Sequence, residues 1–262
     1  MGILHGQLVS VVEVIEITIK DLNGGLRMIN PIELNTDEKY LSDTNYMSVS
    51  RYKRLDKCEF EGSLNTPTIV TESMLIGQFV DSYISGNLDK FIKEHPEIIS
   101  SRGKTKGELK AQFKKAEEIC QYIDNTPTFK QFMQGDKQTV MTGEIEGVPV
   151  KGKFDIYAKG IAINDLKVMA KIRDNRGNYI NFISDWGYDL QMAVYQELAY
   201  QNTGEKLPMF ICAVTKEDII DSAIINIPQE ILDNKLDEFK SNVKRYYDIW
   251  KGKEQANGCG IC

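Results

Sequence analysis

Two short stretches decide the fold of this chain: Gly152-Lys153-Phe154-Asp155 and, ten residues after its aspartate, Asp165-Leu166-Lys167. They read as parts of two strands joined by a tight turn at 158–160. Side chains two positions apart on a strand point the same way, so Asp165 and Lys167 share a face. An acid and a lysine on an apolar strand are unusual in plain core. They suit a site where carboxylate oxygens hold a divalent cation beside a lysine.

The length of the turn decides whether the two aspartates can meet. A three-residue turn at 159–161 places Asp155 opposite Asp165 and Lys153 opposite Lys167. A two-residue turn at 159–160 puts the aspartates on opposite faces, because a slip of one residue reverses every side chain. A shared metal site requires the first register, and the sequence alone permits both.

Asp155 and Asp165 would offer carboxylate oxygens to Mg²⁺ or Mn²⁺, ions that prefer oxygen ligands and keep several waters. Such an ion can polarise a phosphoryl oxygen, lower the pKa of a bound water and stabilise a leaving oxygen. Lys167 would position the water or neutralise charge that develops on the phosphate. The alternative is an exposed hairpin whose Asp165–Lys167 pair is merely solvated and contributes ~0–1 kcal/mol.

The composition is that of a soluble globular protein, with 42% hydrophobic and 27% charged residues among 262. No apolar run approaches the ~20 residues that span a bilayer, and residues 1–10 lack a secretory signal pattern. We therefore expect a cytoplasmic protein without a membrane partner. The formal net charge of −6 weighs against a purely nucleic-acid-binding protein. It is compatible with a DNA enzyme whose positive charge is confined to a groove.

The hydrophobic patterns predict one mixed sheet with helices on both faces. A β-branched run at 7–20 predicts a strand that pairs near 27–29, followed by a loop at 30–47. Helices are expected at 48–57, 71–91, 106–123, 184–202 and 228–250, and strands at 138–146, 147–158, 160–169, 207–214 and 222–227. We divide the chain into an N-terminal strand and hairpin extension (1–47), one domain (48–251) and a Cys-containing tail (252–262).

The two stretches resemble the core of the PD-(D/E)xK nuclease superfamily, in particular the branch of RecB nuclease domains and phage-type exonucleases. That branch has Gly-x-x-Asp followed by Asp-x-Lys. Gln191-Met192-Ala193-Val194-Tyr195 also fits its Gln-x-x-x-Tyr motif, on the helix that follows the hairpin. Gln191 and Tyr195 share one helical face. Taken alone, Tyr195 would be interpreted as a core residue.

The resemblance implies a restriction-endonuclease-like fold across 48–251 and a role for each site residue. Asp155, Asp165 and the backbone carbonyl of Leu166 would bind the metal, and Lys167 would assist the attacking water. Gln191 and Tyr195 would orient the site and the DNA strand. Asp81 stands where the family has a histidine four residues after a glycine. An aspartate there can ligate Mg²⁺, and Glu72 competes for this role.

The function implied by the resemblance is that of a Mg²⁺- or Mn²⁺-dependent DNA nuclease, an exonuclease in a phage, recombination or repair context. The alternative is a DNA-binding subunit that keeps the scaffold but cuts poorly. DNA is the expected partner, and a homo-oligomer or a recombination partner protein stays open. Some relatives hold an iron–sulfur cluster. Such a cluster takes four thiolates, and Cys58, Cys259 and Cys262 are one short, so it is only an alternative.

Overall fold

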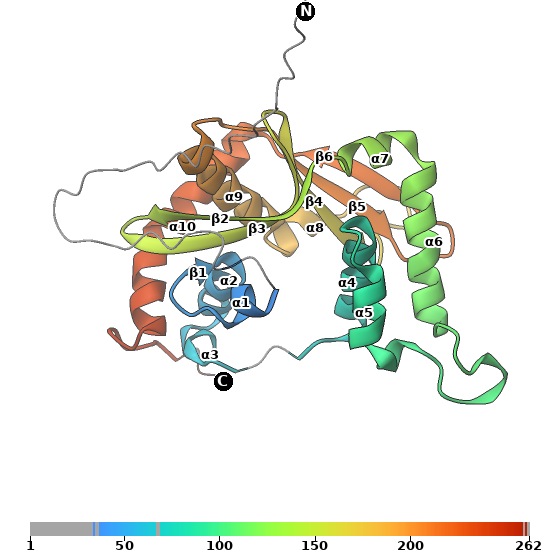
Figure 1. Ribbon diagram of the computed structural model, residues 1–262. Coiled ribbons are helices and arrows are strands. Elements are labelled where there is room, and N and C mark those ends of the chain that lie inside the picture. Colours follow the sequence, from blue (N-terminus) through green and yellow to red (C-terminus); the bar gives the residue numbers. More distant parts are fainter. Residues whose placement is uncertain (1–33, 35–36, 67–68, 259, 261–262) are drawn as a thin grey trace, which may run out of the picture.

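The computed structural model describes residue 34 and residues 37–66, 69–258 and 260 of the chain (Figure 1). The strand predicted at 7–20 and its partner near 27–29 lie outside these residues. The segment 37–47, expected to be part of a loop, contains the short helix α1 (Asp37–Ser42) and the first residue of the short strand β1 (Met47–Ser48).

A mixed sheet of six strands forms the centre of the described part of the chain. β2 (Asp136–Ile145) is antiparallel to β3 (Val148–Ala158) along nearly all of its length. β4 (Ala162–Met169) pairs with β3 in the antiparallel sense and with β5 (Met209–Thr215) in the parallel sense. β6 (Ser222–Asn226) is antiparallel to β5, and β1 is parallel to the first half of β3. The five strands predicted between residues 138 and 227 are therefore present, with ends shifted by a few residues.

Helices cover both faces of the sheet, as predicted, and each face has its own apolar core. One core contains Phe154, Ile163 and Ile211, and the other contains Ile156, Leu166 and Cys212. The first core is closed by α2 (Val49–Lys57), α8 (Phe182–Asp185), α9 (Tyr188–Thr203) and α10 (Gln229–Trp250), with α3 (Glu59–Ser63) packed on α2. The second is closed by α4 (Glu72–Ile84), α5 (Leu88–Glu94), α6 (Ala111–Asn125) and α7 (Pro127–Phe132). Figure 1 shows α4 to α7 together on the right of the view and α2 and α10 on the left.

Two predicted helices are interrupted at glycines with left-handed backbone. The helix expected at 71–91 is divided into α4 and α5, and Gly86 between them has φ of 72°. The helix expected at 184–202 is divided into α8 and α9, and Gly187 between them has φ of 60°. Glycine adopts this conformation without the steric penalty of other residues, so each break follows from the residue at that position.

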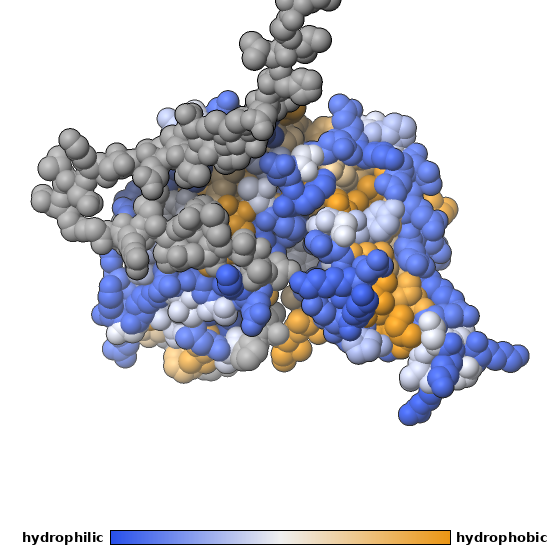
Figure 2. Space-filling model, viewed as in Figure 1, coloured by the Kyte–Doolittle hydropathy of each residue, from blue (hydrophilic) through white to orange (hydrophobic). Residues whose placement is uncertain are grey.

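The surface in this view is mostly hydrophilic, and hydrophobic side chains are visible between α4 and α6 (Figure 2). No helix within the described ranges combines the length and the apolar composition that crossing a membrane requires.

Candidate active site

The β3–β4 hairpin has the three-residue register. Ala158 pairs with Ala162, and Ile156 pairs with Asn164, the last paired residues on this side of the turn. The same register places Asp155 opposite Asp165, just where the two strands part. Asp155 and Asp165 do not continue the backbone pairing of the two strands. The Asp155 side chain reaches β4 instead, and its Oδ2 accepts a 3.0 Å hydrogen bond from the Leu166 N–H.

β3 twists sharply at Asp155. Residues two apart on a regular strand face the same side, yet Phe154 packs in one core and Ile156 in the other. The twist brings the Asp155 side chain to the edge of β3 that faces β4. The sheet therefore opens at the position of the two acids.

Asp165 is a buried carboxylate, only 2% exposed. Its Oδ1 accepts a 2.9 Å hydrogen bond from Gln191 Nε2 on α9. Its Oδ2 lies 2.5 Å from Lys167 Nζ, yet this contact lacks the geometry of a hydrogen bond, and Oδ2 is buried without another partner. A buried oxygen in this condition is the kind of atom that a metal ion can satisfy.

Several carboxylates and lysines interact electrostatically at this point. Burial and the neighbouring Asp155 carboxylate raise the pKa of Asp165 from 3.8 to about 7, although Lys167 opposes the shift. Burial disfavours the Lys167 ammonium, but Asp165 and Asp155 outweigh burial and raise the pKa of Lys167. Burial also raises the pKa of Asp81 well above its ordinary value, with a further contribution from Asp155. Asp81, Asp155 and Asp165 thus act on one another and on Lys167, and a divalent cation would favour the ionised form of these acids.

Asp81 approaches the hairpin from α4, on the face opposite α9. Asp155 and Asp165 both raise the pKa of Asp81, so Asp81 lies within electrostatic range of the two hairpin acids. Glu72, the competing candidate, lies at the start of α4 and accepts a 2.6 Å hydrogen bond from Gln112 at the surface. Of these two acids, the structure therefore brings Asp81 to the site.

Tyr195 lies one turn after Gln191 on α9 and is largely a packing residue. Its ring centroid is 4.8 Å from that of Phe154. A Cβ on Gly152 would approach two ring carbons of Tyr195 to 2.9 Å, so the glycine of the Gly-x-x-Asp stretch makes room for this ring. Burial raises the pKa of Tyr195 well above its ordinary value, and Asp165 and Asp155 contribute. Tyr195 thus supports the strand that carries Asp155.

Sequence reasoning missed Lys53 and did not assign Tyr188 to the site. Lys53 reaches in from α2, and its Nζ donates to the carbonyls of Trp186 at 2.9 Å and Gly187 at 3.3 Å. Burial and the nearby Lys167 ammonium lower the pKa of Lys53 to about 8. The Tyr188 ring centroid lies 4.9 Å from Lys167 Nζ and 5.7 Å from Lys53 Nζ. No pattern in the sequence links Lys53 to the hairpin.

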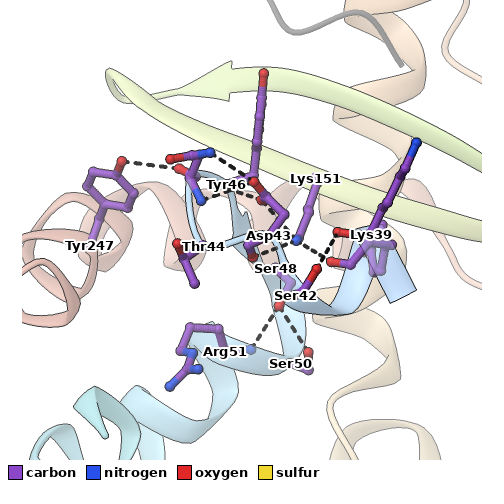
Figure 3. A network of polar contacts seen from close by, with 12 residues as sticks. Lys39, Ser42, Asp43, Thr44, Tyr46, Ser48, Ser50, Arg51, Lys151 and Tyr247 are labelled. Carbon is purple, nitrogen blue, oxygen red and sulfur yellow. Dashed lines mark hydrogen bonds and ion pairs between the residues drawn. The ribbon is translucent and has the colours of Figure 1, made fainter. Parts of the chain in front are cut away.

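The segment around α1 is fixed to β3 beside the site (Figure 3). Lys151, buried on β3, donates to the carbonyls of Tyr40 at 2.5 Å and Asp43 at 3.0 Å. Its Nζ also lies 3.0 Å from Asp43 Oδ2. The Tyr40 ring centroid is 4.7 Å from Lys151 Nζ and 5.6 Å from Lys153 Nζ. The end of the predicted N-terminal extension therefore packs on the strand of the site.

The oxygen donors of Asp81, Asp155 and Asp165 suit Mg²⁺ or Mn²⁺. Across the described residues, no three acidic, histidine or cysteine side chains are yet gathered closely enough to ligate one ion. Lys167 supplies the positive charge beside Asp165 Oδ2. The Asp165 oxygen that lacks a hydrogen bond and the neighbouring carboxylates fit a divalent ion, which would draw the acids together.

The cysteines predicted as alternative metal ligands are not brought together in the described residues. Cys58 is buried, and its Sγ accepts a hydrogen bond from the Glu61 N–H at the start of α3. Cys259 and Cys262 lie outside the described residues.

Comparison with known proteins places the chain in a family. The profile of a PDDEXK-like domain of unknown function, DUF3799, matches residues 48–262. The chain belongs to this family. The matched region begins at the predicted domain start and includes the acids, the lysine and the Gln-x-x-x-Tyr helix.

The fold is also that of a solved structure from Eubacterium rectale named "Putative exonuclease". The two proteins are 41% identical, with a TM-score of 0.79 over 87% of this chain and 90% of that one. This protein therefore has the predicted restriction-endonuclease-like fold. A second solved structure, SSO0001, is 12% identical over 80% of this chain and 87% of that one, and its TM-score of 0.27 carries no argument. A search of curated proteins found no match.

Proposed function

We propose that this protein is a divalent-metal-dependent nuclease that hydrolyses phosphodiester bonds in DNA. Membership of a PDDEXK-like family and the similarity to a protein named as an exonuclease support a nuclease. The observation that carries the proposal is the environment of Asp165, a buried carboxylate between Gln191 and Lys167 with Asp155 alongside.

The residues divide the work of hydrolysis between them. Asp155, Asp165 and the Leu166 carbonyl would hold the metal, and Asp81 would add an oxygen from the opposite face. The metal, when bound, supplies Lewis acidity at the phosphate and an activated water. Lys167 would orient the attacking water and offset charge that develops on the phosphate. Gln191 would hold Asp165 in position, and Tyr195 would support β3.

Exonuclease action, in phage, recombination or repair processes, is the finer form of this proposal, and it rests on the family resemblance and on the E. rectale neighbour. Linear and covalently closed circular DNA of the same sequence separate the two modes of cutting. An exonuclease shortens the linear form and leaves the circle intact. An endonuclease also cuts the circle.

The test compares end-labelled DNA incubated with Mg²⁺, Mn²⁺ or EDTA. We expect degradation with either ion, none with EDTA, and none by an Asp165→Asn variant that remains folded. Asp237→Asn, which neutralises a 78% exposed carboxylate of α10, is the matched control and should keep full activity. DNA binding without cleavage under any metal would instead indicate a DNA-binding subunit. Full activity of Asp165→Asn would overturn the proposed mechanism.

A further inference from the structure

Gln138 has a backbone conformation that its place in β2 does not explain. Among the described residues, Gln138 and Glu146 are the non-glycine residues with positive φ, at 52° and 51°. Glu146 precedes Gly147, whose φ is 70°, in the two-residue turn between β2 and β3, and such a turn requires positive φ at both positions. Gln138 lies inside a strand, where no turn requires this conformation.

No extra residue accounts for it either. Lys137 pairs with Ile156, and Thr139 pairs with Phe154, so the register is the same on both sides of Gln138. A β-bulge would shift the register by one residue. Gln138 is therefore a single left-handed residue within an otherwise regular ladder, and a left-handed glutamine is disfavoured relative to an extended one.

The residue opposite Gln138 in this register is Asp155. Gln138 Nε2 lies 3.4 Å from Asp155 Oδ1 and can donate a long hydrogen bond to it. The other oxygen, Oδ2, accepts the Leu166 N–H at 3.0 Å. The Asp155 carboxylate is thus held at both oxygens by N–H donors from the two neighbouring strands, and each oxygen keeps a further lone pair for a cation.

A neutral amide suits this task. A lysine in the same place would compete with a metal for the carboxylate, whereas an amide fixes its direction and leaves its charge intact. Partners that orient a metal-ligating carboxylate contribute to metal affinity without touching the ion. Backbone strain that persists beside a candidate site points to such a role.

We propose that Gln138 is a positioning residue that uses a strained backbone to hold the Asp155 carboxylate in the orientation that binds a divalent cation. This inference rests on the proposed metal-dependent function. It assigns the left-handed residue of β2 to the site, although Gln138 would itself touch neither the metal nor the phosphate.

The test measures metal binding and stability separately in three variants. Gln138→Gly removes the amide and relieves the backbone, Gln138→Met removes the amide and keeps the strain, and Glu146→Gly relieves the strain of the β2–β3 turn alone. Mn²⁺ affinity is measured by calorimetry and by electron paramagnetic resonance. The melting temperature is measured on the metal-free proteins.

We expect both Gln138 variants to bind Mn²⁺ about 10- to 100-fold more weakly, and Glu146→Gly to bind it as the parent protein does. Metal-free Gln138→Gly should melt no lower than the parent, so that weaker metal binding cannot be attributed to misfolding. Parent-like Mn²⁺ affinity in both Gln138 variants would overturn the inference and leave the nuclease proposal standing. A parent protein that neither binds Mn²⁺ nor cuts DNA would overturn both.

Discussion

Gln191 Nε2 on α9 donates a 2.9 Å hydrogen bond to Asp165 Oδ1 on β4. The bond joins the helix of the Gln-x-x-x-Tyr motif to the strand of the Asp-x-Lys stretch. It also turns the second oxygen of Asp165 toward Lys167, where that oxygen lacks a well-formed hydrogen bond. Gln191 therefore sets the direction of the carboxylate most central to the proposed metal site.

Replacing Gln191 with alanine should reduce nuclease activity about 10- to 100-fold, since partners that orient a metal ligand typically contribute that much. Initial rates of DNA degradation at saturating Mn²⁺ measure the effect. Gln201→Ala is the control on the same helix, because Gln201 bonds to the backbone of Glu144 at 3.0 and 2.9 Å, away from the acids. A larger loss of activity in Gln201→Ala than in Gln191→Ala would contradict the assignment.

Gly152→Ala should lower the free energy of unfolding by ~1–3 kcal/mol, because a new methyl group would overlap the Tyr195 ring. The displaced ring should also disturb β3 and reduce activity. Gly77→Ala is a control with the opposite expected sign. Nothing lies within 4 Å of a Cβ at Gly77 in α4, so alanine there should stabilise the protein by roughly 0.5–1 kcal/mol. Urea denaturation at 25 °C measures both, and equal effects of the two substitutions would rule out this account of Gly152.

The two hairpin turns show where sequence reasoning reaches its limit. Lys159-Gly160 and Glu146-Gly147 look alike as turn dipeptides. In the β2–β3 turn, Glu146 and Gly147 both have positive φ, and the turn has two residues. In the β3–β4 turn, Gly160 alone has positive φ, and the turn has three residues. Whether a charged residue before glycine adopts positive φ depends on the strands it must join. The sequence therefore permitted both registers of the β3–β4 hairpin, and the structure selects the one that lets the acids meet.

The relative positions of the motif residues could be predicted because these residues lie on regular elements close together in the chain. Asp155, Asp165 and Lys167 follow strand periodicity, and Gln191 and Tyr195 follow helical periodicity. Lys53 and Gln138 carry no such signal. Lys53 reaches the site because α2 packs beside α9, and Gln138 reaches it because β2 pairs with β3 in the register that places Gln138 opposite Asp155. Both depend on tertiary structure, which local patterns do not contain.

The buried pair of Lys151 and Asp43 should stabilise the segment that covers β3. Their side chains are only 4% and 8% exposed. Asp43→Ala should therefore lower the free energy of unfolding by ~3–5 kcal/mol, because it leaves a buried ammonium without its carboxylate. Replacing both residues, with Asp43→Leu and Lys151→Met, should lower it much less, since no charge stays buried.

An exposed pair provides the control for Asp43→Ala. Lys90 and Glu94 are 74% and 59% exposed and lie 3.8 Å apart, so Glu94→Ala should change the free energy of unfolding by only ~0–1 kcal/mol. Urea denaturation of the four proteins at one pH provides the comparison. If the double variant proved less stable than Asp43→Ala, the segment would depend on the charges themselves rather than on their mutual compensation.

The metal-free protein should lose stability as the pH rises toward neutrality, and Asp165 should be one cause. Burial raises the pKa of Asp165 from 3.8 to about 7, so the folded state retains a proton that the unfolded state has already released. The unfolded state binds fewer protons in this window, and stability falls as pH rises. The stabilising contribution of Asp165 to the free energy of unfolding is thus fully present below pH ~4 and is lost as the pH rises through ~7.

Melting temperatures of the parent protein and Asp165→Asn at pH 5 and pH 8, both with EDTA, test the predicted direction of this pH dependence. Asparagine cannot ionise, so the stability of the variant relative to the parent should be higher at pH 8 than at pH 5. Asp237→Asn should show no such gain, since its side chain is 78% exposed. Metal ligands must be deprotonated, so Mn²⁺ affinity of the parent should rise over the same interval. A parent protein whose stability relative to Asp165→Asn is the same at both pH values would contradict the raised pKa. Any rise of Mn²⁺ affinity between pH 5 and pH 8 would then come from groups other than Asp165.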